Sequence, residues 1–311
     1  MRRRLGTSGL AVTPLALGTM TWGTGVDRHE AGEHLRTFLE AGGNLVDTAF
    51  GYGGGESESM LGELLADPAV RAEVVVATKS GISRTGGQRR VDVSRRGLMT
   101  QLETSLRRLG TDHVDLWLVH TWADDVPLAE TLSALEWAAD SGRARYVGVS
   151  NYGGWQSARA ASLLEQSRVP LVANEVEYSL VCRAPETEVA PAALALGHGL
   201  LAWSPLGRGV LTGKYRNGIP AGSRAASADF PGFVTRFLDE HSVRVAEAVT
   251  MAARGLGVSP AQVALAWVRD RPGVTAPIVG ARTSGQLRAA LGSLDLVLPD
   301  EIVGALDDVS A

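Results

Sequence analysis

Four ionisable side chains lie at or just after the ends of three successive apolar runs, and they are Asp47, Tyr52, Lys79 and His120. If these runs are neighbouring strands, the four side chains meet at one rim. An ammonium beside a carboxylate stays charged, and a tyrosine hydroxyl near that ammonium is expected to have a pKa below its usual value of about 10. Tyr52 could then protonate a carbonyl oxygen while His120 hydrogen-bonds the same oxygen.

The chemistry that this set suggests is reduction of a carbonyl group by hydride transfer. The hydride has to come from a cofactor, because no side chain supplies one. Each residue also has a simpler interpretation: the aspartate could cap a turn, the tyrosine could pack over glycines, the histidine could be a core residue, and the lysine could end a strand in solvent. The four together favour an active site.

Lysine is scarce in this chain, which has 30 basic residues of which only Lys79 and Lys214 are lysine. The lysine ammonium is compact and its pKa moves readily with its surroundings, which the guanidinium of arginine does not do. The lysine that ends the apolar run VVVATKS is therefore a candidate for chemistry.

Polar residues at the ends of later runs are suited to holding the cofactor. Ser150, Asn151 and Glu175 offer hydrogen-bonding groups, and Trp203 offers a flat face for stacking on a planar ring. The alternative is that Trp203 is a core residue.

Basic residues gather after the seventh run. The loop at 204–215 contains glycines together with Arg208 and Lys214, and Arg224 and Arg282 add further cations. Phosphates are the natural anions for such a loop. The alternative is that these cations only solubilise the surface.

Eight short apolar runs, separated by helical patterns, predict the elements that position these residues. Most runs are continuously apolar, as expected of parallel strands buried on both faces. The alternation predicts an α/β fold, a (β/α)8 TIM barrel. A doubly wound open sheet is the alternative, but it more often carries a glycine-rich phosphate turn after its first strand, and GxGxxG is not found there. The predicted strands are the runs at 15–20, 44–49, 74–80, 114–120, 145–151, 171–178, 199–206 and 276–282.

Capping signals predict several of the helices. Asp27 and Ser94 are expected to begin helices, Gly110 to end the second of these, and Ser259 to cap another whose first residue is proline. A gap of about seventy residues separates the seventh and eighth runs and predicts a long inserted loop and helix at 207–240.

Composition excludes several classes of protein. The 311 residues are 45% hydrophobic and 21% charged with a net charge of −4, which argues against a general affinity for nucleic acid or an anionic membrane. Cys182 is the only cysteine, so no intrachain disulfide is possible, and a reducing compartment is expected. The segment that follows the N-terminal MRRR lacks the uninterrupted apolar core of a signal peptide. A cytoplasmic protein with one domain, residues 1–311, is predicted.

The chain resembles the aldo-keto reductase superfamily along nearly its whole length, and most of all the branch that includes bacterial reductases and potassium-channel β subunits. The resemblance implies a barrel with an N-terminal β-hairpin, NADPH as the cofactor and no metal. The motifs that carry it, in family order and spacing, are DTAFGYGGGESESMLGELL (47–65), VVVATKSG (74–81), SLRRLGTDHVDLWLVH (105–120), GRARYVGVSN (142–151), NEVEYSL (174–180), SPLGRGVLTGKY (204–215) and PIVGAR (277–282).

The resemblance also assigns roles to residues. It implies that Asp47, Tyr52, Lys79 and His120 are catalytic, with Tyr52 as the general acid in reduction. We also expect Trp22, Phe50 and Trp122 to form the aromatic mouth of the substrate pocket with Tyr52 and His120, although ordinary loop packing is the alternative for these three. The residues expected to bind the cofactor are Thr19, Met20, Asp47, Ser150, Asn151, Glu175, Trp203, Ser204, Leu206, Gly209, Lys214, Arg224, Gly280, Arg282 and Gln286.

Two positions depart from the family pattern. Glu175 stands where the family usually has glutamine, and a carboxylate can accept a hydrogen bond from the nicotinamide carboxamide but cannot donate one to it. Ala289 and Ala290 stand where glutamate and asparagine commonly hold the adenine. We expect weaker cofactor contacts at both places.

The main functional hypothesis is an NADPH-dependent reductase of aldehydes or ketones, sugars included, acting on small-molecule carbonyl substrates. One alternative is a cofactor-binding regulatory or scaffold subunit with little turnover, which would not need all four catalytic residues. Another is a barrel enzyme of unrelated chemistry, such as an isomerase or hydrolase, which would not need nicotinamide. The sequence does not decide between a monomer and a homo-oligomer.

Overall fold

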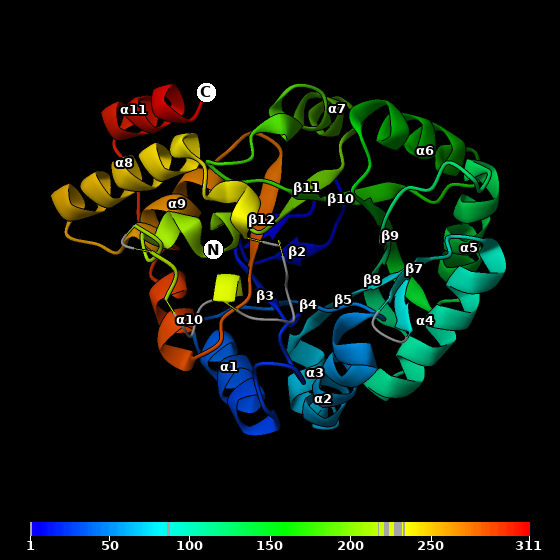
Figure 1. The fold of residues 1–311 in the computed structure, drawn as a ribbon. Coiled ribbons are helices and arrows are strands. Elements are labelled where there is room, and N and C mark those ends of the chain that lie inside the picture. Colours follow the sequence, from blue (N-terminus) through cyan, green and yellow to red (C-terminus); the bar gives the residue numbers. More distant parts are fainter. Residues whose placement is uncertain (1, 86–87, 217, 221–223, 227–231, 233) are drawn as a thin grey trace.

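The protein is a closed barrel of eight parallel strands in a computed structural model that describes residues 2–85, 88–216, 218–220, 224–226, 232 and 234–311. Helices surround the strands (Figure 1). Each of the eight predicted runs overlaps a barrel strand, so the predicted (β/α)8 fold is confirmed. Around the barrel the strands are β3 (Ala16–Gly18), β4 (Leu45–Asp47), β5 (Val75–Ser80), β8 (Val114–Val119), β9 (Ala144–Ser150), β10 (Leu171–Glu177), β11 (Gly199–Trp203) and β12 (Val274–Val279).

Helices connect the strands, and capping residues set many of their ends. The Ser94 side chain accepts a hydrogen bond from the Gly97 amide at the start of α4, and Gly110 ends that helix with φ +64°. Asp27 and Ser259 cap α1 and α9 in the same way, as predicted. The helices are α1 (Arg28–Glu40), α2 (Glu56–Leu65), α3 (Pro68–Glu73), α4 (Arg95–Leu109), α5 (Leu128–Asp140), α6 (Gly154–Gln166), α7 (Val189–Leu196), α8 (Glu240–Leu256), α9 (Pro260–Arg269), α10 (Ser284–Leu291) and α11 (Asp300–Ser310).

The N-terminal hairpin, β1 (Arg3–Arg4) and β2 (Ala11–Val12), covers the end of the barrel where the strands begin. Its Leu5 and Val12 are fully buried in one cluster with inward-facing strand residues such as Leu116 and Leu201. The Thr7 amide donates to the carbonyl of Gly197, just before β11, at 2.7 Å. This end of the barrel is therefore filled with side chains.

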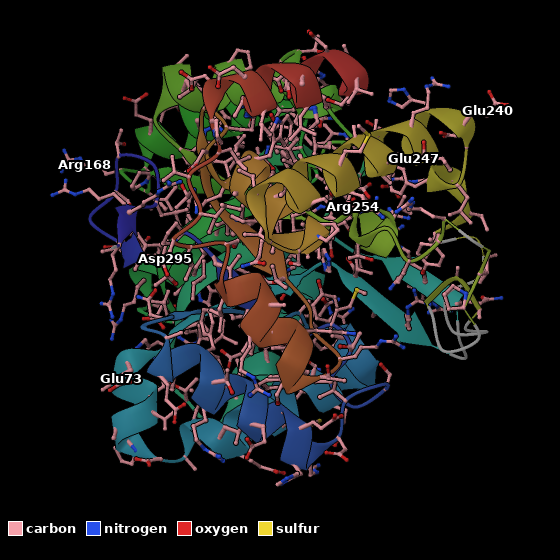
Figure 2. The ribbon with its side chains drawn as sticks, turned by 90° about the vertical axis from the view of Figure 1, so that its left-hand side faces the viewer. Glu73, Arg168, Glu240, Glu247, Arg254 and Asp295 are labelled. Atoms are coloured by element: carbon pink, nitrogen blue, oxygen red, sulfur yellow. The ribbon has the colours of Figure 1, made fainter. Side chains whose placement is uncertain are left out.

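A second hairpin, β6 (Ile82–Thr85) and β7 (Gln88–Val91), follows β5 directly and was not predicted. It projects from the end of the barrel opposite the N-terminal hairpin, as does the segment after β11 (Figure 2). The long insertion predicted between the last two strands is confirmed, and it holds the short helical turns η3 (Gly207–Thr212), η4 (Arg224–Ala226) and η5 (Thr235–Phe237) before α8 and α9. Among the described residues, no helix is long and apolar enough to cross a membrane.

Strand alternation decides which side chains face the barrel interior. In β5, Ala77 belongs to the interior cluster, whereas Val76 packs in the outer core beneath the helices. Successive side chains point to opposite faces of a strand, so Lys79 faces inward with Ala77, and Thr78 faces outward. Thr78 donates to the buried Glu58 of α2 at 2.7 Å, which fixes that helix to the strand that carries Lys79.

Candidate active site

A cavity of about 610 Å³ lies at the end of the barrel where the strands finish. Asp47, Tyr52 and His120 line it, and the fully buried Lys79 lies directly behind Asp47. The four predicted catalytic residues are therefore brought together, as expected for parallel strands whose carboxyl ends share one rim.

Lys79 is the centre of this group. Its ammonium donates a hydrogen bond to Oδ1 of Asp47, lies 3.0 Å from Oε2 of Glu175, and lies 5.4 Å from the centre of the Tyr52 ring. Burial alone would lower the pKa of Lys79, but the carboxylates of Asp47 and Glu175 outweigh burial and raise it. The lysine is therefore a permanent cation.

The pKa of Glu175 differs from that of an ordinary glutamate because of the residues around it. Burial, followed by repulsion from Asp47, raises the pKa of Glu175 to about 8, although Lys79 opposes the shift. Two carboxylates around one ammonium would leave a net negative charge in a buried site, and a proton on Glu175 removes it. The raised pKa favours the neutral form of Glu175, and a neutral carboxylic acid can both donate and accept a hydrogen bond. In that form the side chain at position 175 is not limited to accepting a hydrogen bond, as an ionised carboxylate is.

Tyr52 and His120 lie next to each other on the cavity wall. Their rings meet edge to face, with centres 6.0 Å apart and an angle of 80° between planes. Burial raises the pKa of Tyr52; Lys79 opposes this shift, and the negative charge of Asp47 adds to it. The lowered pKa that we predicted for Tyr52 is therefore wrong, because burial and the Asp47 carboxylate outweigh the Lys79 ammonium.

His120 is neutral at physiological pH. Burial, followed by the positive charges of Lys79 and Arg89, lowers the pKa of His120 well below its ordinary value. The side-chain amide of Asn151 donates to the His120 backbone carbonyl at 3.0 Å, which holds the end of β8 against the end of β9. A neutral imidazole at this point can hydrogen-bond a substrate oxygen without competing with it for the proton.

The wall expected to hold the cofactor contains strained backbone. Asn151, Ser204 and Arg208 have φ between +52° and +59°, and all three line the cavity. Side chains other than glycine rarely adopt this conformation, and it is found most often at functional sites. The strain positions Trp203, whose indole nitrogen donates to Oδ1 of Asn151 at 3.1 Å.

Most predicted cofactor residues line this cavity and could hold an elongated dinucleotide. A Cβ at position 209 would lie 2.8 Å from the Lys214 ammonium, so a glycine there leaves room for that cation over the loop. The lining residues among our predictions are Met20, Asp47, Ser150, Asn151, Glu175, Trp203, Ser204, Leu206, Gly209, Lys214, Gly280, Arg282 and Gln286.

Two predicted cofactor residues are placed differently. Thr19 does not line the cavity, because its buried hydroxyl donates to the Asp47 carbonyl at 3.0 Å and pairs with Ser57. Its role is to hold the strand end that carries Asp47. Arg224 begins the turn η4, but its side chain lies outside the described residues.

Tyr52 and His120 of the predicted substrate pocket line the cavity, but its three other aromatic residues lie elsewhere. Trp22 is fully buried in the core between barrel and helices, because its loop folds back on Thr19. Phe50 lies under the guanidinium of Arg108 in a separate hollow. Trp122 packs edge to face against Tyr152 and Trp155. None of the three lines the cavity.

Sequence reasoning missed Arg89, which lines the cavity from β7. It also placed Arg208 among the cations of a phosphate-binding loop, with a solubilising surface residue as the alternative, whereas the structure buries Arg208. The guanidinium of Arg208 is held by Glu177 through Nε at 3.0 Å, and it lies over the ring of Trp203. A polar hairpin carries no hydrophobic period, so nothing in the local pattern pointed to Arg89.

Comparison with known proteins gives a consistent result. The model of the aldo/keto reductase family matches residues 14–311. The chain is 38% identical to the uncharacterized oxidoreductase YrpG of Bacillus subtilis (strain 168), over 98% of this chain and 94% of that protein. It is 36% identical to a probable voltage-gated potassium channel subunit beta of Oryza sativa subsp. japonica, over 99% of this chain and 95% of that protein. It is 32% identical to L-glyceraldehyde 3-phosphate reductase of Escherichia coli (strain K12), over 94% of this chain and 87% of that protein.

Proposed function

Because the chain belongs to the aldo/keto reductase family, we propose that it reduces an aldehyde or a ketone to the alcohol with NADPH, and that Tyr52 is the general acid. The observation that carries this proposal is the position of Lys79, buried between Asp47 and Glu175 and facing Tyr52. Strand ends from three parts of the sequence supply these buried charged side chains. The barrel does not need such a cluster for its packing, so the cluster favours a catalytic role.

When bound, NADPH supplies the hydride. The residues of the chain do the rest. Trp203 offers its flat ring to nicotinamide, and Asn151 fixes the orientation of that ring. Glu175, as a neutral acid, can donate to the carboxamide oxygen and accept from the carboxamide nitrogen, as a glutamine does. Lys214 and Arg282 line the cavity as cations for phosphate groups, which is the basis for our choice of NADPH over NADH.

Tyr52 holds the proton that the carbonyl oxygen needs. Its raised pKa keeps the hydroxyl protonated at neutral pH, as a general acid in reduction must be. The tyrosinate formed after proton transfer would lie beside Lys79, whose charge stabilises it. His120, being neutral, can hydrogen-bond the carbonyl oxygen and orient it toward the Tyr52 hydroxyl.

Replacement of Tyr52 by phenylalanine tests the proposal. We expect Tyr52→Phe to lower kcat for carbonyl reduction by about 10²- to 10⁴-fold, the usual contribution of a general acid, while NADPH still quenches tryptophan fluorescence as in the wild type. Reduction is followed by the loss of NADPH absorbance with a panel of aldehydes, ketones and sugars. Tyr146→Phe, in β9 and away from the cavity, is the matched control. Full activity in Tyr52→Phe would refute the assignment.

A cofactor-binding subunit with little turnover is the second candidate, and the 36% identity to a probable potassium channel subunit beta favours it. The presence of all four catalytic residues in one cavity argues for turnover. Tight NADPH binding together with no reduction of any carbonyl in the panel would support the subunit instead.

A further inference from the structure

The hairpin β6–β7 carries positive charge without any acidic residue. Arg84, Arg89 and Arg90 lie within ten residues, and no aspartate or glutamate occurs between Ile82 and Val91. The hairpin leaves the barrel directly after Ser80 and projects beyond the cavity end (Figure 2). A segment of this charge at the mouth of a site affects which molecules the site attracts.

The register of the hairpin places two of these cations opposite each other. Arg84 pairs with Arg89, and Ser83 pairs with Arg90, so the first two share one face of the hairpin and Arg90 lies on the other. Like charges directly opposite each other destabilise a strand pair. Neither the Arg84 nor the Arg89 guanidinium has a hydrogen bond or ion pair with any residue that the structure describes. Arg89 lines the cavity, whereas Arg84 lines the separate hollow beside Phe50. An anion at Arg89 would offset the repulsion between the two cations.

Arg89 lies on the substrate side of the cavity. It lines the cavity together with Tyr52 and His120, and its charge contributes to the neutral state of His120. Lys214 and Arg282 belong to the wall where we place the cofactor phosphates, and Arg208 is held by Glu177. Arg89 is thus a cation of the cavity that the cofactor does not account for.

We propose that Arg89 binds an anionic group, a phosphate or a carboxylate, on the carbonyl substrate, with Arg84 adding to the positive potential. This inference rests on the proposed function, because it places the carbonyl at Tyr52 and His120. The planar guanidinium presents paired donors that match either anion. The substrate class is therefore small aldehydes or ketones that carry a negative charge a few atoms from the carbonyl.

Matched substrate pairs test this inference. Glyceraldehyde 3-phosphate is compared with glyceraldehyde, and succinic semialdehyde with butanal, so that the two pairs separate phosphate from carboxylate. We expect Arg89→Gln to lower kcat/KM for a charged member by about 10- to 100-fold, mainly through KM, as expected for loss of a charge-assisted hydrogen bond. The neutral members should change by less than about twofold. Arg89→Lys should recover part of the loss, and Arg90→Gln, on the opposite face, should behave as the wild type.

Binding without turnover separates failure of this inference from failure of the proposed function. Succinate and glycerol 3-phosphate carry the anions without a carbonyl, and their binding to the NADPH-saturated protein can be followed by fluorescence. Weaker binding of either anion to Arg89→Gln than to Arg90→Gln supports the inference even if no substrate turns over. Equal binding of both anions to the two variants, or equal kcat/KM on charged and neutral substrates in Arg89→Gln and the wild type, would overturn it and leave the reductase proposal standing.

Discussion

Glu175 shows how a single residue changes its chemistry with its surroundings. In water a glutamate is an anion at neutral pH, but here it is 2% exposed and shares Lys79 with Asp47. A proton on Glu175 balances the charges of the group. The acid then resembles the amide of glutamine, which suggests why this departure from the family pattern is compatible with cofactor binding.

We predict that Glu175→Gln weakens the dependence of stability on pH. The pKa of Glu175 is about 8 in the folded protein and near 4.5 when unfolded, so between these values the folded state holds one more proton than the unfolded chain. Stability therefore falls as pH rises through this window, by up to about 1.4 kcal/mol per pH unit, and the loss is complete above the folded pKa. Glutamine does not titrate, so this slope should be absent in the variant.

Urea unfolding of both proteins at several values between pH 5 and pH 9 measures this difference. Glu165→Gln, in α6 and away from the cavity, is the control, and it should keep the wild-type slope. Identical slopes in the wild type and Glu175→Gln would mean that Glu175 is ionised throughout the range.

Helix α2 connects the outer layer of the barrel with the active site. Its Glu58, fully buried, accepts from Thr78 of β5 and from Arg108 of α4 at 3.0 Å. Its Ser57 donates to the Thr19 carbonyl at 3.0 Å. The strand ends that carry Asp47 and Lys79 are held from behind by this helix.

The close approach of α2 to α4 depends on Gly62. A Cβ at this position would lie 2.2 Å from the Arg108 carbonyl oxygen, which belongs to the backbone and cannot move aside alone. We predict that Gly62→Ala separates the two helices and lowers the free energy of unfolding by about 1–3 kcal/mol, as overpacking usually does. Denaturant unfolding followed by circular dichroism measures the change.

Gly304 is the matched control, because it lies inside α11, where a Cβ would have no neighbouring atom within 4 Å among the described residues. Gly304→Ala should raise the free energy of unfolding by about 0.5–1 kcal/mol, since alanine favours helix. If Gly62→Ala also stabilised the protein, the close approach of α2 to α4 at Gly62 would be contradicted.

Among the secondary-structure elements, the sequence predicted the barrel strands well and the loops and hairpins less well. Most residues of the barrel strands are buried on both faces of the sheet, so a mostly apolar run marked each strand. The hairpin β6–β7 has the exposed strand Gln88–Val91 and therefore no apolar run. The position of Trp22 depends on how its loop folds back toward Val26, a contact that no local pattern encodes.

The whole molecule has one filled end and one open end. The N-terminal hairpin fills the barrel where the strands begin, and the cavity lies where they finish. The meeting of the four candidate catalytic side chains was predictable from sequence because strand ends fix their positions. The position of Arg89 on the cavity wall was not predictable, because it depends on a hairpin outside the barrel.

We predict that cofactor binding stabilises the entire fold. NADPH at a concentration of 100 times its Kd should raise the free energy of unfolding by about 2.7 kcal/mol. For a chain of 311 residues this corresponds to a rise in Tm of roughly 4 °C. NADH at the same concentration should raise Tm less, because it lacks the additional phosphate for Lys214 and Arg282.

Differential scanning fluorimetry measures both shifts. Lys214→Gln and Arg282→Gln should reduce the difference between the cofactors, whereas Arg254→Gln, on the outer helix α8, should not. Equal shifts with NADH and NADPH would argue against a phosphate contact at these two residues.

Because the chain has only two lysines, selective acylation of lysine can report on two defined places in the molecule. Lys79 is 0% exposed, whereas Lys214 is exposed on the loop after β11. Of the two lysine side chains, an amine-acylating reagent should therefore label only Lys214 while the protein stays folded. If Lys214 contacts cofactor phosphate as proposed, its acylation rate, followed by mass spectrometry, should fall when the cofactor binds. Any label on Lys79 measures the fraction of molecules in which the barrel has opened.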